Sequence, residues 1–153
     1  PTSGEILLNG LKPGPETKSF VSYLPDANYL PDWMNIDGLV GMFADFYADF
    51  DRKKAEEMLK QLNLREKDRL KTLSKGNKEK VQLILAMSRK AEIYFLDEPI
   101  GGVDPAARDY ILNTIIRNYS EDALVEMSTH LIADIERSSI YQSRKRCFSS
   151  QCR

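Results

Sequence analysis

The sequence predicts an α/β fold built on a parallel β-sheet, and three observations carry this prediction. The apolar run Ile93–Leu96 leads directly into two carboxylates and a proline, as a doubly buried strand does at its end. A helical pattern with Ile111 and Ile115 on one face comes next, and then a second apolar run, Ala123–Met127. Strand, helix and strand form a βαβ unit with parallel strands and a right-handed crossover.

Asp97 and Glu98 mark the end of the first of these strands. Pro99 comes directly after them, and proline has no N–H to give to the ladder. The two carboxylates are therefore expected at the carboxyl end of a central strand, where open α/β sheets bind their ligands. Adjacent carboxylates at such a place are costly unless a positive charge lies beside them, and Mg²⁺ is the natural candidate.

The amino-terminal part of the chain predicts two short strands. Residues 6–10 indicate a strand that enters a tight turn at Asn9-Gly10. Phe20–Leu24 indicates a second strand, which a proline ends. The next segment, Asp26–Met34, is too polar for a core and too apolar for an ordinary loop. We expect it to cover a site or to dock a partner.

Three helices are expected between residues 37 and 90. Asp37 can cap the first and Asp51 the second. Both helices carry apolar residues at helical spacing, which we interpret as core rather than as cofactor contacts. These residues are Leu39, Val40, Met42, Phe43, Phe46 and Tyr47 in the first helix, and Ala55, Met58, Leu59 and Leu62 in the second. The third helix is expected from about Lys78 to Lys90 and is largely buried.

The turn Leu73–Asn77 and the only histidine are further candidate site features. Serine and glycine before a helix can offer free N–H groups and the positive end of the helix dipole to an anion, and a plain N-cap is the alternative. His130 comes after the second apolar strand. If that strand neighbours the Asp97 strand, His130 lies at the same sheet edge, which favours a functional over a structural role.

The bulk composition is that of an ordinary globular protein. The 153 residues carry 22 Lys and Arg against 23 Asp and Glu, a net charge of -1, so no basic excess indicates a nucleic-acid partner. No apolar run approaches the ~20 residues of a membrane helix. Cys147 and Cys152 form no disulfide framework and, without nearby histidines, are interpreted as free thiols rather than metal ligands. A cytosolic setting fits these features.

Four segments together resemble the motifs of the ATP-binding subunit of an ABC transporter. Leu73–Asn77, Tyr94–Pro99, Gly101–Pro105 and Ser128–His130 match the signature loop, Walker B, D-loop and H-loop, in that family's order. The resemblance covers residues 1–137. It implies an α/β, P-loop NTPase-like parallel sheet core with a helical subdomain at about residues 35–75, incomplete at the N-terminus.

The resemblance also implies a role for each matched residue. Asp97 would hold Mg²⁺ through water, and Glu98 would be the general base for the attacking water. His130 would contact the γ-phosphate and stabilise its charge. The remaining implied ATP-site residues are Ser74, Lys75, Gly76 and Asn77 of the signature loop, Asp104 across a dimer interface, and Asp26 near metal-bound water.

The sequence departs from the family pattern at several positions. Lys75 and Asn77 replace the glycine and glutamine of the usual Leu-Ser-Gly-Gly-Gln, and Asp26 stands where the Q-loop often has glutamine. The Gly-Gly-Val-Asp-Pro form resembles exporter subunits more than importers. No G-x-x-x-x-G-K-[ST] phosphate loop is found, because Lys18-Ser19 lacks the required glycines. Residues 1–6 resemble the segment just after the Walker A helix of the family, so we expect the phosphate loop to precede them.

Residues 138–153 show no periodicity and few apolar side chains. We interpret them as an out-of-frame or artificial end, and a basic tail for a membrane or nucleic acid is the alternative. For the whole, the resemblance implies ATP binding and hydrolysis with Mg²⁺, coupled to transport by integral membrane permease subunits. It also implies a second ATP-binding subunit, no nucleic acid, and a place at the cytoplasmic face of the membrane. The alternatives are a soluble ABC-type ATPase of translation or DNA repair and a catalytically inactive fragment.

Overall fold

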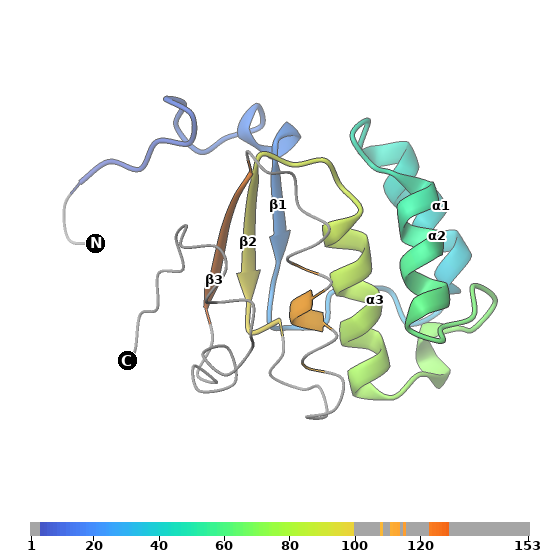
Figure 1. Ribbon diagram of the computed structural model, residues 1–153. Helices are drawn as coiled ribbons and strands as arrows, with labels where there is room; N and C mark the ends of the chain where they lie inside the picture. The colour runs from blue at the N-terminus through green and yellow to red at the C-terminus, as the bar shows by residue number, and fades with distance from the viewer. Residues whose placement is uncertain (1–3, 100–107, 109–110, 114, 116–122, 129–153) are drawn as a thin grey trace.

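In the part of the chain that the structure describes, the sheet and the helices lie in three layers (Figure 1). The structure is a computed structural model and describes residues 4–99, 108, 111–113, 115 and 123–128. Three parallel strands lie in the order β1-β2-β3. Helix α3 packs on β1, and the pair α1 and α2 packs on the other side of α3. The bounds are Val21–Leu24 for β1, Ile93–Asp97 for β2, Leu124–Ser128 for β3, Ile36–Phe46 for α1, Arg52–Gln61 for α2 and Lys75–Met87 for α3, with short 3-10 helices η1 at Thr17–Ser19 and η2 at Leu70–Thr72.

Strand β2 is the central strand of the described sheet, as its apolar sequence predicts. It pairs in parallel with β1 and β3, and Leu96 lies beside Leu24 on one side and Met127 on the other. Tyr94 and Leu96 are almost fully buried. The predicted α/β class with a parallel sheet is confirmed. Strand β3 is shifted by one residue from its expected range, which brings Ser128 into the ladder.

Two of the three expected helix starts are wrong, and each error has a local cause. Helix α1 is capped by Asn35, whose side-chain oxygen accepts a hydrogen bond from Gly38 N, and Asp37 lies inside the first turn. Helix α3 begins at Lys75, three residues earlier than expected, because Ser74 is its N-cap. It also ends three residues earlier than expected, at Met87. The expectation for α2 is confirmed, since Asp51 caps it through Lys54 N.

The apolar stripes of α1 and α2 form core, with one exception. Buried residues of both helices belong to a single cluster with the sheet and α3. Phe46 is the exception, because its side chain is 78% exposed at the last position of α1. The interpretation of the stripe as core is therefore confirmed for the inner turns of α1 and wrong for its last residue.

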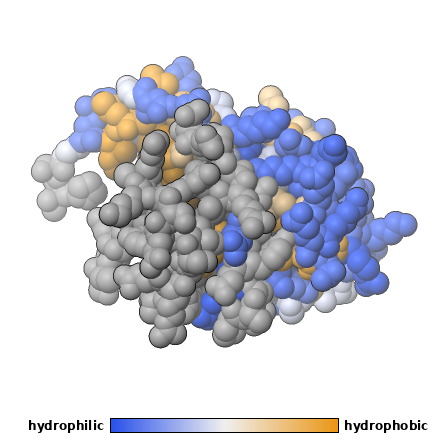
Figure 2. Space-filling view, in the orientation of Figure 1, coloured by the Kyte–Doolittle hydropathy of each residue, from blue (hydrophilic) through white to orange (hydrophobic). Residues whose placement is uncertain are grey.

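The amino-terminal segment makes no strand at residues 6–8, which corrects the expectation. Leu8 and Leu11 form one isolated antiparallel bridge across a turn. The predicted turn is present, with φ of 50° at Asn9 and 79° at Gly10. Figure 2 shows hydrophobic colour gathered over this segment, at the upper left, where Ile6, Leu7 and Leu11 are exposed.

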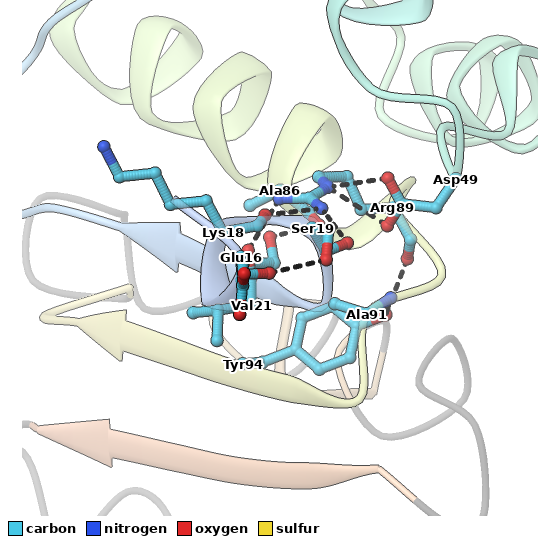
Figure 3. Close-up of polar contacts among 10 residues, drawn as sticks. Glu16, Lys18, Ser19, Val21, Asp49, Ala86, Arg89, Ala91 and Tyr94 are labelled. Carbon is cyan, nitrogen blue, oxygen red and sulfur yellow. Dashed lines mark hydrogen bonds and ion pairs between the residues drawn. The ribbon is translucent and has the colours of Figure 1, made fainter. Parts of the chain in front are cut away.

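A buried arginine joins the sheet to the helices (Figure 3). The Arg89 guanidinium is bonded to Asp49 through Nε at 3.1 Å. Its two NH groups donate to the carbonyl oxygens of Val21, Lys18 and Ser19 at 2.6, 3.1 and 2.8 Å. The guanidinium also lies 4.0 Å from the centre of the Tyr47 ring. Arg89 is only 4% exposed, and these contacts fix the end of α3 to both β1 and the α1–α2 connection.

Backbone bonds and a tyrosine reinforce this junction. Asp51 N donates to Ser88 O and Lys90 N donates to Asp49 O, at 2.7 and 3.0 Å. The Tyr94 hydroxyl donates to Arg89 O at 2.6 Å. Burial raises the pKa of Tyr94, so its phenol stays protonated and remains a donor at neutral pH. We call the side chains of Arg89, Asp49, Tyr47 and Tyr94 the Arg89 junction.

Across the described ranges, the structure contains no helix that is both long and apolar enough to span a bilayer.

Candidate functional site

Asp97 and Ser128 form the centre of the candidate site. The parallel register places them side by side at the carboxyl ends of β2 and β3. The Ser128 hydroxyl donates a hydrogen bond to Asp97 Oδ1. Because one carboxylate oxygen is held from the side of β3, the Asp97 side chain is oriented before any ligand arrives.

Glu98 lies immediately beyond the strand in an unusual backbone conformation. Its φ is 47°, in the left-handed region that side chains with a Cβ rarely adopt. Its N–H donates to Ser128 O at 3.0 Å, which ties this strained residue to the end of β3. Strained residues of this kind cluster at ligand and active sites. Asp97 and Glu98 are both half-buried.

The donor set at this strand end fits a magnesium ion. Mg²⁺ prefers hard oxygen ligands, keeps several waters and commonly uses one or two protein carboxylates together with substrate phosphates. Asp97 supplies a carboxylate oriented by a hydroxyl, and Glu98 adds a second carboxylate. Among the described residues there is no group of three or more His, Cys, Asp or Glu side chains that could hold a metal alone. Two adjacent carboxylates fit an ion that takes one or two protein carboxylates and completes its shell with water and phosphate oxygens.

The turn Leu73–Asn77 forms the N-terminus of α3. The Ser74 side chain accepts a hydrogen bond from Asn77 N at 3.3 Å, so Ser74 is an N-cap. A plain N-cap was the alternative to an anion site at this turn. Ser74 and Lys75 are exposed, and Gly76 and Asn77 are half-buried. Helix α3 runs antiparallel to the strands, so this turn and the carboxyl ends of the strands lie toward the same end of the molecule (Figure 1). A capped N-terminus does not exclude an anion, because further N–H groups of the first turn remain.

Asp26 lies at the same edge of the sheet, two residues beyond the end of β1. It is exposed. The next residue, Ala27, accepts a hydrogen bond from Gln82 Nε2 of α3 at 3.3 Å. This segment thus contacts α3, and the structure gives no contact between Asp26 and Asp97.

Two residues of the expected site lie outside the described residues. These are His130, the expected γ-phosphate contact, and Asp104, the expected interface residue. Gly101, Gly102 and the tail at 138–153 are outside them as well.

Sequence reasoning missed Ser128 as a partner of Asp97 and Asp32 as a partner of α3. The register of two parallel neighbours could have indicated Ser128, because Asp97 and Ser128 each close an apolar run. No local pattern indicates Asp32, whose carboxylate lies 2.7 Å from Lys78 Nζ, 46 residues further along the chain.

Comparison with known proteins gives one consistent family. The family model described as ABC transporter matches residues 1–101. The ABC transporter ATP-binding protein YtrB of Bacillus subtilis (strain 168) is 30% identical over 138 residues, covering 88% of this chain and 47% of that protein. The chain thus spans about half the length of this relative.

Solved structures agree with the fold. The structure of an ATP-binding subunit of an ABC transporter is 28% identical, with a TM-score of 0.76, covering 89% of this chain and 60% of that one. A Pyrococcus furiosus protein described as an ABC transporter ATP-binding protein has a TM-score of 0.75 at 23% identity, covering 97% and 70% of the two chains. The second likeness shows the fold alone.

Proposed function

Because this chain belongs to the ABC transporter family, we propose that in the complete protein the strand end at Asp97 and Glu98 binds and hydrolyses ATP. The hydrolysis drives transport of a substrate across a membrane through integral permease subunits. The protein acts at the cytoplasmic face of that membrane and pairs with a second ATP-binding subunit. Similarity to ATP-binding proteins of transporters supports this function over a soluble ABC-type ATPase of translation or repair.

The observation that carries the proposal is the arrangement of Asp97, Glu98 and Ser128. One carboxylate is oriented by a hydroxyl, and the next is held at a strained turn by the same residue. A metal-holding carboxylate and a separate base are the two protein groups that phosphoryl transfer to water requires. Asp97 holds Mg²⁺, which when bound neutralises part of the phosphate charge. Glu98 orients the attacking water and accepts its proton.

The other expected residues complete the site. His130 contacts the γ-phosphate, and Asp26, two residues beyond β1, contacts metal-bound water. Ser74 and Gly76 contact the γ-phosphate of ATP held by the opposite subunit, with Lys75 and Asn77 beside them in the ATP site, and Asp104 works across the same interface. The first turn of α3 supports this role, because its exposed Ser74 and Lys75 place a hydroxyl and a cation beside backbone N–H groups.

The permease docks beside β1 and the segment Asp26–Met34. A cleft of about 570 Å³ opens there. Trp33 belongs to the same segment without lining the cleft, and it is 77% exposed. Exposed aromatic side chains are typical of protein interfaces. The aromatic and proline residues that line the cleft are Pro13, Tyr23, Pro25, Tyr29, Phe43 and Tyr47. A helical subdomain at about residues 35–75 supplies one wall of this surface.

The proposal is tested by Glu98→Gln in the full-length protein. The amide cannot take up a proton, so steady ATP hydrolysis falls by about 10²–10⁴-fold, the usual contribution of a general base. ATP binding, measured by calorimetry, is retained. Glu126→Gln is the matched control, because Glu126 is an exposed glutamate of β3 two residues before that strand ends. A loss of only a few-fold in Glu98→Gln would remove Glu98 from the role of base.

A further inference from the structure

Asp32 contacts the chain on both sides of the turn Leu73–Asn77. Its backbone oxygen accepts a hydrogen bond from Lys71 N at 3.0 Å, before the turn. Its carboxylate accepts one from Lys78 Nζ at 2.7 Å, after the turn. A single residue therefore links the segment that enters the turn to the helix that leaves it.

Lys78 is itself part of the geometry of the turn. Its N–H donates to Ser74 O at 3.0 Å, which closes the first turn of α3. The side chain of Lys78 is only 18% exposed, and that of Asp32 is 55% exposed. The ion pair is therefore partly shielded from water on the α3 side, where charge interactions are stronger than at a free surface.

Asp32 is also joined to an exposed aromatic residue. Trp33, the next residue, is 77% exposed. Met34 O accepts a hydrogen bond from Leu70 N at 3.0 Å, so residues 32–34 and 70–71 run side by side. A displacement of Trp33 therefore also moves Asp32, which contacts the chain on both sides of the turn Leu73–Asn77.

We propose that Asp32 is a positioning residue for the turn Leu73–Asn77 and that it transmits movement of residues 32–34, which include Trp33, to that turn. The inference rests on the proposed function, in which the turn meets ATP of the opposite subunit. Asp32 touches no nucleotide itself. It sets where Ser74 lies relative to the loop through its contacts to Lys71 and Lys78.

The first test measures the turn directly, without activity. In the full-length protein, Asp32→Asn keeps the backbone bond to Lys71 and removes the charge that pairs with Lys78. Hydrogen exchange at the amides of Asn77 and Lys78 is expected to accelerate by roughly fivefold, near the upper range for a partly exposed ion pair. Unchanged exchange at these two amides would overturn the proposal.

A matched control separates this effect from general loosening. Asp37→Asn breaks the pair with Arg52, which has the same 2.7 Å separation but joins α1 to α2. Exchange at Asn77 and Lys78 is expected to stay at the wild-type rate in this variant. Equal acceleration in both variants would show that Asp32 has no special link to the turn.

The second test uses charge reversal and ATP hydrolysis by the full-length protein with its permease. Asp32→Lys opposes Lys78 with a like charge and is expected to lower kcat about fivefold or more, whereas the Kd for ATP stays constant. The double variant Asp32→Lys with Lys78→Glu restores the pair in reverse and is expected to recover kcat to within about twofold. An active wild type with no recovery in the double variant contradicts the inference. An inactive wild type instead contradicts the proposed function, and the exchange measurement still decides the role of Asp32.

Discussion

Asp97 and Ser128 lie opposite each other at the ends of β2 and β3, and the Ser128 hydroxyl donates to Asp97 Oδ1. A residue that orients a metal-holding carboxylate typically changes metal affinity by 10–100-fold when it is removed. Ser128→Ala is therefore expected to raise the Mg²⁺ concentration for half-maximal ATP hydrolysis by about tenfold or more. Ser128→Thr retains a hydroxyl and is expected to stay near wild type. Ser19→Ala, at the opposite end of the sheet, is the control, and an equal Mg²⁺ requirement in all three variants would contradict the role of Ser128.

Trp33→Ala is expected to weaken the association with the permease. Trp33 supplies a large exposed aromatic surface on the proposed docking loop. The measurement is co-purification with the membrane partner, together with the ATPase rate of the isolated protein, which should be unaffected. Phe46→Ala is the matched control, because the Phe46 side chain is 78% exposed, close to the 77% of Trp33, but lies at the end of α1. If Phe46→Ala reduced co-purification as much as Trp33→Ala, the docking surface would not be centred on Trp33.

Two glycines of α1 should respond oppositely to alanine. A Cβ at Gly38 would lie 2.8 Å from Asn35 Oδ1, the atom that caps the helix, whereas a Cβ at Gly41 meets nothing within 4 Å. Gly41→Ala is expected to raise the free energy of unfolding by about 1 kcal/mol through helix propensity. Gly38→Ala gains the same propensity but disturbs a cap worth about 1 kcal/mol, so no net gain is expected. Chemical denaturation measures both, and an equal gain would show that the Asn35 cap is unimportant.

Asp51 makes the stability of α2 depend on pH. The N–H of Lys54 donates to its carboxylate and is the main cause that lowers the pKa of Asp51 below its usual 3.8. A carboxylate with a lowered pKa stabilises the fold above its unfolded pKa, and the contribution disappears as pH falls through the folded value. Asp51→Ala is therefore expected to cost about 1 kcal/mol at pH 7.

The comparison across pH is the test of this cap. The difference in unfolding free energy between wild type and Asp51→Ala is expected to shrink as the pH is lowered from neutral to below 3.8. Asp51→Ser, which can cap without a charge, should show a smaller pH dependence than wild type. A difference that stays constant with pH would mean that the charged form has no special role.

Arg89 should not tolerate lysine. Its guanidinium reaches Asp49 and three backbone oxygens at once, and an ammonium group cannot reproduce that geometry. Lysine keeps the charge but leaves buried carbonyl oxygens without a donor, at a cost of about 1–3 kcal/mol each, so Arg89→Lys is expected to lower the free energy of unfolding by a few kcal/mol. Arg52→Lys, at an exposed pair, is expected to change stability little. Similar losses in the two variants would contradict the importance of the junction.

The central strand and its two carboxylates could be predicted from the sequence because the signal is local. An apolar run that ends in Asp97-Glu98-Pro99 has few other interpretations, and the parallel order β1-β2-β3 confirms it. The cap of α1 could not be chosen the same way, because Asn35 and Asp37 are both good caps two residues apart. Packing decides between them, since Ile36 is fully buried as the first helical residue.

The long-range contacts could not be predicted from the sequence. Arg89 and Asp32 look like ordinary surface charges in their own segments, and their partners lie 40 to 71 residues away. Only the fold brings Arg89 to Asp49 and Asp32 to Lys78. The same reason explains Phe46, whose helical spacing fits a core position although the helix ends there.

The Arg89 junction also has a consequence for how the chain folds during synthesis. The partners of Arg89 at residues 18–21 and 49 leave the ribosome long before Arg89 itself does. Contacts of such high sequence separation form slowly, because a long loop must close first. The α1–α2 pair is therefore expected to lack its attachment to β1 until translation has passed Arg89, and a stall before that point leaves Asp49 and Tyr47 without their central partner.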